Sequence, residues 1–272
     1  MEEEDWPFRD LSSDEEEEAP AGGGEGRRRV CPECVRPVTS CLCDAFPDEP
    51  IRLKSGGVVL ILQHPLEKKR KLATVPLLRK SLERCEVLVG RDFRRPGRFP
   101  ELDRVMSLAE AGECEVFVLY PGAESLDLAG VVEEGRKRAT ATESGSRRDH
   151  RWALVAIDGT WQQAKEMFNC SKDRLLPPGI KGVHRVNLND GTRPLCRLPL
   201  RSEPVEGCVT TLEAVATALG ILEDSPSLAD AIMAPLAKLV RLQQEFSPAL
   251  RERAQGKMSY KATRRTKLAG SS

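Results

Sequence analysis

The segment from Trp152 to Trp161, with the sequence WALVAIDGTW, most constrains how this 272-residue chain can fold. Its first six residues, 152–157, are apolar and partly β-branched, which is typical of a strand buried on both faces. The apolar run ends at Asp158, and residues 162–169 are rich in helix-forming side chains. The segment therefore predicts a central strand that leads into a helix, with a carboxylate at the junction. In open α/β sheets, ligands bind at this carboxyl edge of the strands.

The residues between that strand and its helix have both a structural and a functional interpretation. Asp158 and Gly159 alone would fit an ordinary turn, in which Gly159 supplies backbone freedom. Thr160 can cap the helix or offer its hydroxyl to a substrate. Trp161 fits either a core position or a surface on which a ring could stack. The combination Asp-Gly-Thr-Trp at the end of so apolar a strand favours a site.

Further strand-like runs along the chain predict an α/β fold. Strands are expected at residues 58–62, 86–89, 116–120 and 183–188. They alternate with helical patterns and show no hairpin signal, so we predict a mainly parallel sheet covered by helices. The carboxyl ends of parallel strands meet at one edge, which would gather four loops there. These loops contain Gln63, His64 and Pro65; Tyr120, Pro121 and Gly122; Asp158 to Trp161; and Thr210 with Thr211.

Three further helices are predicted from apolar periodicity and capping signals. Lys68–Leu82 has apolar positions on one side, although Pro76 disfavours a helix in its first part. Thr210 and Glu213 have the spacing of a capping box and predict the start of a second helix. Residues 228–246 predict a long amphipathic helix. In that helix we expect the burial of Ile232, Leu236, Leu239, Val240 and Leu242.

The distribution of charge points to a polyanionic partner. The chain has no net formal charge, but eleven acids and one arginine lie in residues 1–26. Residues 27–272 therefore contain 41 basic and 31 acidic residues, and nucleic acid would suit such a body. The acidic, glycine-rich leader 1–27 is predicted to be disordered, and the basic segment 251–272 to be a flexible tail. An ordinary solvated surface is the alternative.

Four cysteines near the amino terminus have the spacing of a metal site. Cys31 and Cys34 form a C-x2-C pair, and Cys41 and Cys43 follow as a C-x-C pair. Two thiolate pairs on tight turns suit a tetrahedral zinc ion, and four sulfur ligands leave no position open for catalysis. We therefore predict a structural zinc knuckle at residues 28–50. Disulfides are disfavoured because no secretory signal is found, and coincidence is the remaining alternative.

Other functional classes lack their characteristic residues. The sequence has no P-loop, no G-x-G-x-x-G after a strand, no G-x-S-x-G and no H-E-x-x-H. No apolar run approaches the ~20 residues that cross a bilayer, so no membrane partner is expected. The basic run Lys68–Lys71 fits a nuclear signal, a solvated helix start or an RNA contact. We expect the protein in both the cytoplasm and the nucleus.

Taken together, these motifs resemble those of the DTW-domain proteins, which are tRNA-uridine aminocarboxypropyltransferases. The resemblance extends over about residues 28–250 and implies a DTW α/β catalytic domain at residues 51–250. Because this family is placed near the SPOUT methyltransferases, the resemblance also implies a SPOUT-like fold with a C-terminal knot, a rare feature in proteins. The motifs that carry it are the four cysteines, Gln63-His64-Pro65-x-Glu67, Asp158-Gly159-Thr160-Trp161 and Thr210-Thr211.

The resemblance also implies a reaction and its partners. S-adenosylmethionine would donate its 3-amino-3-carboxypropyl group to N3 of a uridine in the D-loop of tRNA, and methylthioadenosine would be the other product. Asp158 would take the N3 proton or hold the ammonium group of the donor, and the residues leave both roles open. Thr160 and Trp161 would shape the catalytic pocket. The donor-binding residues are expected to be Gln63, His64, Glu67, Tyr120, Pro121, Gly122, Gly159, Thr210 and Thr211.

Two rival functions share much of this pattern. One is an RNA methyltransferase of the SPOUT type, which would release S-adenosylhomocysteine instead of methylthioadenosine. The other is a non-catalytic, zinc-containing RNA-binding protein, which would not bind S-adenosylmethionine. In each case the basic loop Arg91–Arg98 and the basic tail would hold RNA phosphates. Protein partners are not indicated by the sequence.

Overall fold

The computed structural model describes three stretches of the chain. They are residues 29–141, without residues 35, 55, 69, 71 and 72, and residues 151–188 and 210–246. The predicted leader and tail lie outside the described residues. So does the connection 189–209, and the predicted C-terminal knot therefore stays a prediction.

Strands and helices alternate along the described ranges. The strands are β1 (Val58–Gln63), β2 (Cys85–Val89), β3 (Cys114–Leu119), β4 (Leu126–Asp127), β5 (Arg151–Asp158) and β6 (Val183–Asn187). The α-helices are α1 (Val75–Ser81), α2 (Pro100–Glu110), α3 (Leu128–Ala141), α4 (Trp161–Leu175), α5 (Thr211–Leu222) and α6 (Pro226–Phe246). The 3-10 helices are η1 (Val38–Ser40), η2 (Cys43–Ala45) and η3 (Pro65–Glu67).

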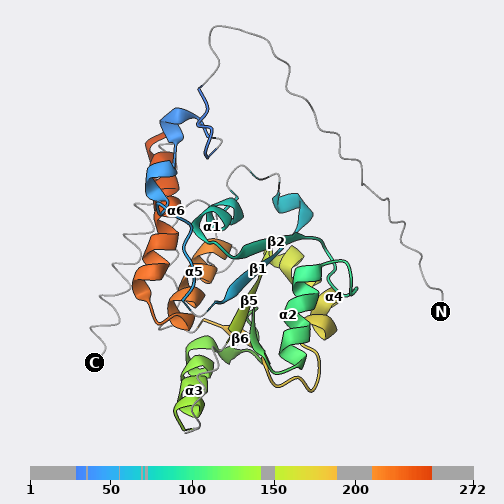
Figure 1. The fold of residues 1–272 in the computed structure, drawn as a ribbon. Helices are drawn as coiled ribbons and strands as arrows, with labels where there is room; N and C mark the ends of the chain where they lie inside the picture. Colours follow the sequence, from blue (N-terminus) through green and yellow to red (C-terminus); the bar gives the residue numbers. More distant parts are fainter. Residues whose placement is uncertain are drawn as a thin grey trace, which may run out of the picture.

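The described strands form one six-stranded sheet in the order β2-β1-β5-β3-β6-β4 (Figure 1). All of its strand pairs are parallel, which confirms the predicted sheet. The chain passes from β1 to β2 on one side of β5, whereas β3 lies on the other side. The strand order therefore reverses around β5, and ligands bind at such reversals, outside the carboxyl ends of the strands.

Helices cover both faces of the sheet, so β5 is buried on both sides as its apolar sequence predicts. Leu154 and Ala156 face the core beneath α1, α3, α5 and α6. Ala153 and Val155 face the other core, beneath α2 and α4. This alternation follows from the two-residue period of a strand, which sends successive side chains to opposite faces.

The predicted helices agree with the structure in part. The helix expected at residues 68–82 begins only at Val75, with Pro76 in its first turn, where a proline without an N–H is tolerated. Helix α2 was not predicted at all. Ile232, Leu236, Leu239 and Val240 of α6 are buried as expected, but Leu242 is only half-buried. Among the described helices, none is long and apolar enough to cross a membrane.

The four-cysteine knuckle, predicted at residues 28–50, packs onto the helical layer beside α6 (Figure 1). Leu42, between two of the cysteines, is fully buried and belongs to the same apolar cluster as α1, α5 and α6. Asp44 of η2 pairs with Lys238 of α6. The knuckle therefore shares its core with the α/β domain.

Candidate active site

Asp158 lies at the carboxyl end of β5 and is held by side chains from two other elements. Its Oδ2 accepts a hydrogen bond from Nε2 of Gln63 at 3.0 Å, and its Oδ1 accepts one from Oγ1 of Thr211 at 2.7 Å. The side chain is buried, with 8% of its surface exposed. One donor on each oxygen fixes the plane of the carboxylate and leaves further acceptor positions for a ligand.

Strand pairing and a helix cap bring these three residues together. Gln63 is the register partner of Asp158 in the β1–β5 pair, and the backbone oxygen of Asp158 accepts a bond from the N–H of His64 at 2.8 Å. Thr210 caps α5 in a capping box with Glu213. This cap sets the first helical residue, Thr211, against the end of β5. Three of the four predicted loops therefore meet at the end of β5.

The turn after Asp158 ends in a second capping box, at the start of α4. The hydroxyl of Thr160 accepts a bond from the N–H of Gln163 at 3.3 Å, and the Gln163 side chain accepts one from the N–H of Thr160 at 2.8 Å. A Cβ at Gly159 would lie 3.1 Å from Cβ of Gln163, so this turn has little room for a larger residue. Trp161 is 49% exposed and therefore is not a core residue. Part of its aromatic surface therefore faces solvent at the start of α4.

His64 and Glu67 are both buried at the start of the loop after β1, and the backbone of His64 bonds to that of Asp158. Nδ1 of His64 accepts a bond from the N–H of Leu66 at 3.2 Å, which leaves Nε2 as the protonated nitrogen of a neutral ring. Burial lowers the pKa of His64 below its ordinary 6.5, and the charges of Arg91 and Arg70 lower it further, so the ring is neutral at pH 7. Glu67 pairs with Arg70 at 3.1 Å.

The loop at Tyr120–Gly122 is fixed by an arginine that the sequence did not single out. Arg185 of β6 donates to the backbone oxygens of Tyr120 at 3.1 Å and of Pro121 at 2.9 Å. Its guanidinium also lies 5.1 Å from the centre of the Tyr120 ring, which stacks on Phe168 of α4. A Cβ on Gly122 would come within 1.9 Å of Nη2 of Arg185, so a larger residue there would have to displace this guanidinium. Burial raises the pKa of Tyr120, which stays protonated.

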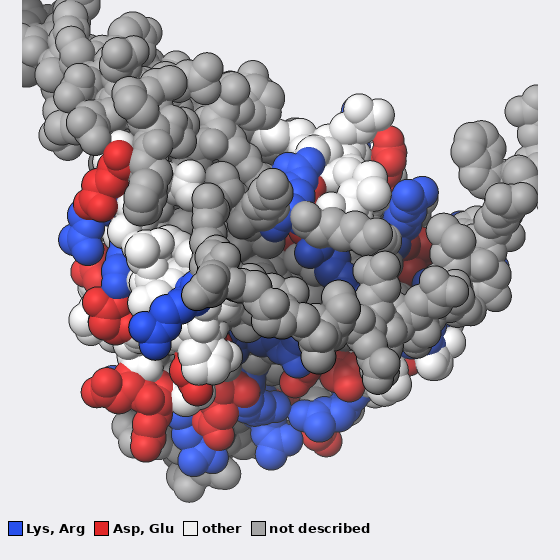
Figure 2. Space-filling view, turned by 90° about the horizontal axis from the view of Figure 1, so that it is seen from above, with Lys and Arg blue, Asp and Glu red and all other residues white. Residues whose placement is uncertain are grey.

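The carboxyl edge of the sheet carries positive charge near the site. In addition to burial, the charges of Arg91 and Arg70 lower the pKa of His64, and the charge of Glu166 on α4 raises it. The amino ends of α4 and α5 add the positive ends of two helix dipoles. Figure 2 looks down on the molecule and shows Lys and Arg side chains mixed with acidic ones over the visible surface. The edge therefore offers positive charge from Arg91 and the helix ends, and negative charge from Asp158 and Glu166, to a ligand that carries both signs.

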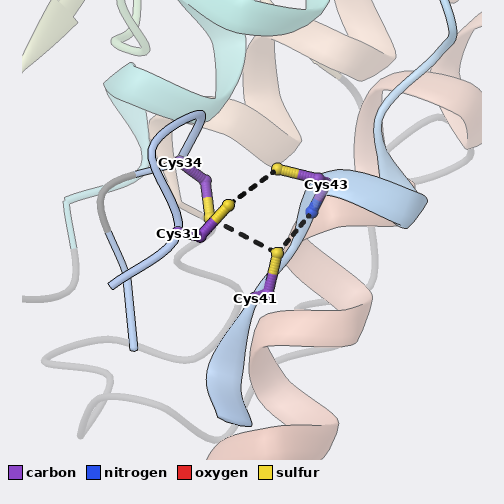
Figure 3. Close-up of side chains that lie close together, drawn as sticks. All are labelled: Cys31, Cys34, Cys41 and Cys43. Carbon is purple, nitrogen blue, oxygen red and sulfur yellow. Dashed lines mark hydrogen bonds between the residues drawn. The ribbon is translucent and has the colours of Figure 1, made fainter. Parts of the chain in front are cut away.

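The four cysteines of the knuckle form a cluster with the dimensions of a zinc site (Figure 3). Their sulfur atoms all lie within 4.8 Å of one another, and the Cys31–Cys43 and Cys34–Cys41 pairs are each 3.7 Å apart. A zinc ion at ~2.3 Å from four tetrahedral sulfurs separates them by about 3.8 Å. A disulfide would need a distance of about 2.05 Å. The residues therefore fit structural zinc and not a pair of disulfides.

The thiols of this cluster do not ionise equally. The backbone N–H groups of Cys34 and Glu33 lower the pKa of Cys31 to about 6. Burial raises the pKa of Cys43 to about 12. The amide groups around Cys31 therefore favour the thiolate, which is the form that binds zinc.

Comparison with known proteins agrees with this arrangement. The model of the DTW domain family matches residues 28–244. The chain is 32% identical to tRNA-uridine aminocarboxypropyltransferase 2 of Drosophila melanogaster, over 80% of this chain and 76% of the relative. It is 31% identical to the protein of the same name of Mus musculus, over 83% of this chain and 67% of the relative.

A plant relative is also similar, over most of both chains. The chain is 30% identical to tRNA-uridine aminocarboxypropyltransferase A of Arabidopsis thaliana, over 84% of this chain and 85% of the relative. No solved structure matches. The family match covers the knuckle, the Asp158 edge and both capped helices, and the chain therefore belongs to the DTW-domain family.

Proposed function

We propose that this protein is a tRNA-uridine aminocarboxypropyltransferase. In this proposal it transfers the 3-amino-3-carboxypropyl group of S-adenosylmethionine to N3 of a D-loop uridine in tRNA. The observation that carries the proposal is the Asp158 carboxylate, oriented by Gln63 and Thr211 at the strand reversal of a DTW-domain chain. The names of the relatives, which are tRNA-uridine aminocarboxypropyltransferases, support the same reaction.

The reaction exchanges one bond for another at a single carbon. The uridine N3 loses its proton, and its electron pair forms a bond to the aminocarboxypropyl carbon next to sulfur. The bond from that carbon to sulfur breaks, and its electrons stay with methylthioadenosine. The sulfonium makes three neighbouring carbons electrophilic, so the enzyme must select one by placing it in line with N3.

The charges at the carboxyl edge indicate how the donor would be oriented. The amino ends of α4 and α5 would favour the carboxylate of its amino acid part. Asp158 would attract the ammonium group, or accept the N3 proton of the uridine. The half-exposed ring of Trp161 would stack on the adenine or on the extruded uracil. His64, which is neutral, would donate a hydrogen bond from Nε2 without adding charge.

The uridine has to leave its stack to reach this edge. N3 is on the Watson–Crick side of the base, so the base must be unpaired or turned out of its loop. Of the predicted phosphate contacts in the loop after β2, Arg94 is paired with Asp92, and Arg98 lies over the ring of Phe99. Arg91 and Arg95 are therefore the stronger candidates for contacts with RNA phosphates.

We also propose that the knuckle holds one structural zinc ion through Cys31, Cys34, Cys41 and Cys43. The sulfur separations support this assignment. Four sulfur ligands complete the coordination of zinc, so the ion would stabilise the fold and take no part in the transfer.

Product analysis tests the proposed reaction. Purified protein, tRNA and S-adenosylmethionine should give a uridine whose mass rises by one aminocarboxypropyl group, with one methylthioadenosine per product. Asp158→Ala should lower turnover by about 100-fold or more while the protein stays folded. Asp173→Ala, which removes an exposed carboxylate on α4, is the matched control and should keep full activity. Release of S-adenosylhomocysteine, or no binding of the donor, would overturn the proposal.

Steady-state kinetics of Asp158→Asn would then separate the two roles of the carboxylate. A residue that holds the ammonium group contributes to donor binding, so its loss raises KM for S-adenosylmethionine. A general base acts only in the transition state, so its loss lowers kcat and leaves donor binding nearly unchanged. Calorimetric titration with S-adenosylmethionine measures the affinity for the donor directly.

A further inference from the structure

A second hollow with strong positive charge lies at the opposite edge of the sheet, where the strands begin. It has a volume of about 540 Å³. Val58 at the start of β1, Cys114 at the start of β3 and Arg151 at the start of β5 all line it. The hollow is therefore separate from Asp158, which lies at the other end of β5.

Basic side chains surround this hollow, and no acidic residue is among its lining residues in the described part of the chain. Leu53 and Trp152, both at least nine-tenths buried, give it an apolar floor. The basic residues come from four separate segments. They are Arg52, Lys54, Arg84, Arg104 and Arg151.

Nearby acids neutralise only part of this charge. Arg52 pairs with Glu83 at 3.4 Å, and Arg84 donates to the backbone oxygen of Gly56 at 2.6 Å. Arg104 and Arg151 are exposed, and neither forms an ion pair with a carboxylate in the described ranges. Two guanidinium groups therefore face the hollow with their donors directed to solvent or to a ligand.

A neighbouring hollow does contain acids. Glu86 and Glu101 line it together with Arg84 and Arg104, and its volume is about 420 Å³. Arg104 lies on the boundary between the two hollows, and Arg151 lines only the basic one. The excess of positive charge is therefore concentrated on the side of Arg151. Burial raises the pKa of the Cys114 thiol, whereas Arg151 lies close enough for its charge to lower it.

We propose that this hollow binds backbone phosphates of the same tRNA whose uridine reaches Asp158, so that the RNA contacts both edges of the sheet. This inference rests on the proposed function, because it takes tRNA as the substrate. The two edges are about 20 Å apart, from the length of β1 at ~3.3 Å per residue. A folded RNA can reach both edges at once.

The chemistry of the hollow fits a polynucleotide backbone better than a free nucleotide. Sites for small ligands are mostly apolar, with a few polar groups placed to select one ligand. Here the polar lining is cationic and exposed, and its members come from separate segments of the chain. Such side chains neutralise phosphates and set the position of an RNA without reading its sequence.

Binding of tRNA to the doubly substituted protein Arg104→Gln and Arg151→Gln tests the proposal. The dissociation constant for tRNA should rise by about tenfold at 0.15 M salt. The slope of log K against log salt should become shallower by about 1.4–1.8, because each lost phosphate contact contributes about 0.7–0.9. Turnover at tRNA concentrations below KM should fall in proportion. Circular dichroism and thermal denaturation establish that the variant is folded.

The matched control is Arg79→Gln with Arg241→Gln, which removes two exposed arginines on α1 and α6. It should keep the affinity, the salt slope and the turnover of the unsubstituted protein. An equal loss in both double variants would show a general effect of charge and overturn the proposal. So would an unchanged salt slope in the Arg104 and Arg151 variant.

Two further experiments test whether a free nucleotide binds the hollow instead of RNA, and whether the proposed function itself is right. Titration with AMP and ATP asks whether a free nucleotide binds the hollow. Nucleotide binding that is lost in the Arg104 and Arg151 variant, with tRNA affinity unchanged, would overturn the inference. Modification of tRNA by the unsubstituted protein reports on the proposed function alone. Refutation of phosphate binding in the hollow can therefore be distinguished from refutation of the proposed activity.

Discussion

The hydrogen bond from Thr211 to Asp158 should be necessary for both stability and turnover. Thr211→Val replaces the hydroxyl by a methyl group of nearly the same size, so the change removes the bond without opening a cavity. The bond is 2.7 Å long and its acceptor is a carboxylate with 8% exposure. Hydrogen bonds to charged groups contribute about 1.5–3 kcal/mol. At ~2–4 °C per kcal/mol, a loss of about 2 kcal/mol lowers Tm by about 4–8 °C.

A double-mutant cycle isolates this bond from other effects of the substitution. Thr211→Val, Asp158→Ala and the double variant are compared by denaturant unfolding. In the Asp158→Ala background, Thr211→Val should change the free energy of unfolding little. The coupling energy between the two residues is then about 1–2 kcal/mol. Thr211→Ser keeps the hydroxyl and is the control, with stability close to that of the unsubstituted protein. Equal costs of valine in both backgrounds would refute the structural reasoning.

The same variant should also be slower, because the bond orients the carboxylate. A displacement of about 1 Å at a reacting group can cost about 100-fold in rate. We expect Thr211→Val to lower turnover by about 10- to 100-fold, and Thr211→Ser to change it little. Normal turnover in Thr211→Val would show that Gln63 alone is sufficient to hold Asp158 in place.

Three further predictions concern other parts of the molecule. The pKa of His64 is lowered in the folded state, so the unfolded chain binds the extra proton first, and stability should fall as pH drops below about 6.5. His64→Gln should remove that part of the pH dependence of Tm, and identical pH profiles would contradict the assignment. Gly122→Ala should displace Arg185 from the Tyr120–Gly122 loop, with a loss of about 0.5–1.5 kcal/mol in unfolding free energy for a lost hydrogen bond, and slower turnover. Metal analysis should find about one zinc per chain, lost together with thermal stability in the variant Cys31→Ser with Cys34→Ser, and a stable, active, metal-free protein would contradict the zinc site.

The parts of the fold that follow from local patterns were predictable. The apolar run of β5 and the capping box at Thr210 each identify an element from a few adjacent residues. Helix α2 also carries such a signal, because Leu102, Val105, Met106 and Ala109 have helical spacing and are buried. The spacing of these four residues is therefore sufficient to predict α2 from the sequence.

The contacts of the site were less predictable, because they depend on pairing between distant segments. Gln63 and Asp158 meet because β1 and β5 pair in one register, and a shift by one residue would turn each side chain to the other face. Arg185 binds a loop more than sixty residues earlier in the chain, and nothing in its local sequence marks it. Composition and motifs indicate which loops meet at the carboxyl edge of the sheet. Which side chains bond to each other there is determined by the tertiary structure.

The place of Asp158 on the innermost strand has a consequence for motion during the reaction. Strands β1, β5 and β3 form the middle of the sheet and are covered on both faces, so this region is expected to open least often. An acid attached there cannot travel toward its substrate. Conformational adjustment then falls to the nucleic acid, and RNAs whose loop already samples an unstacked uridine would be modified fastest.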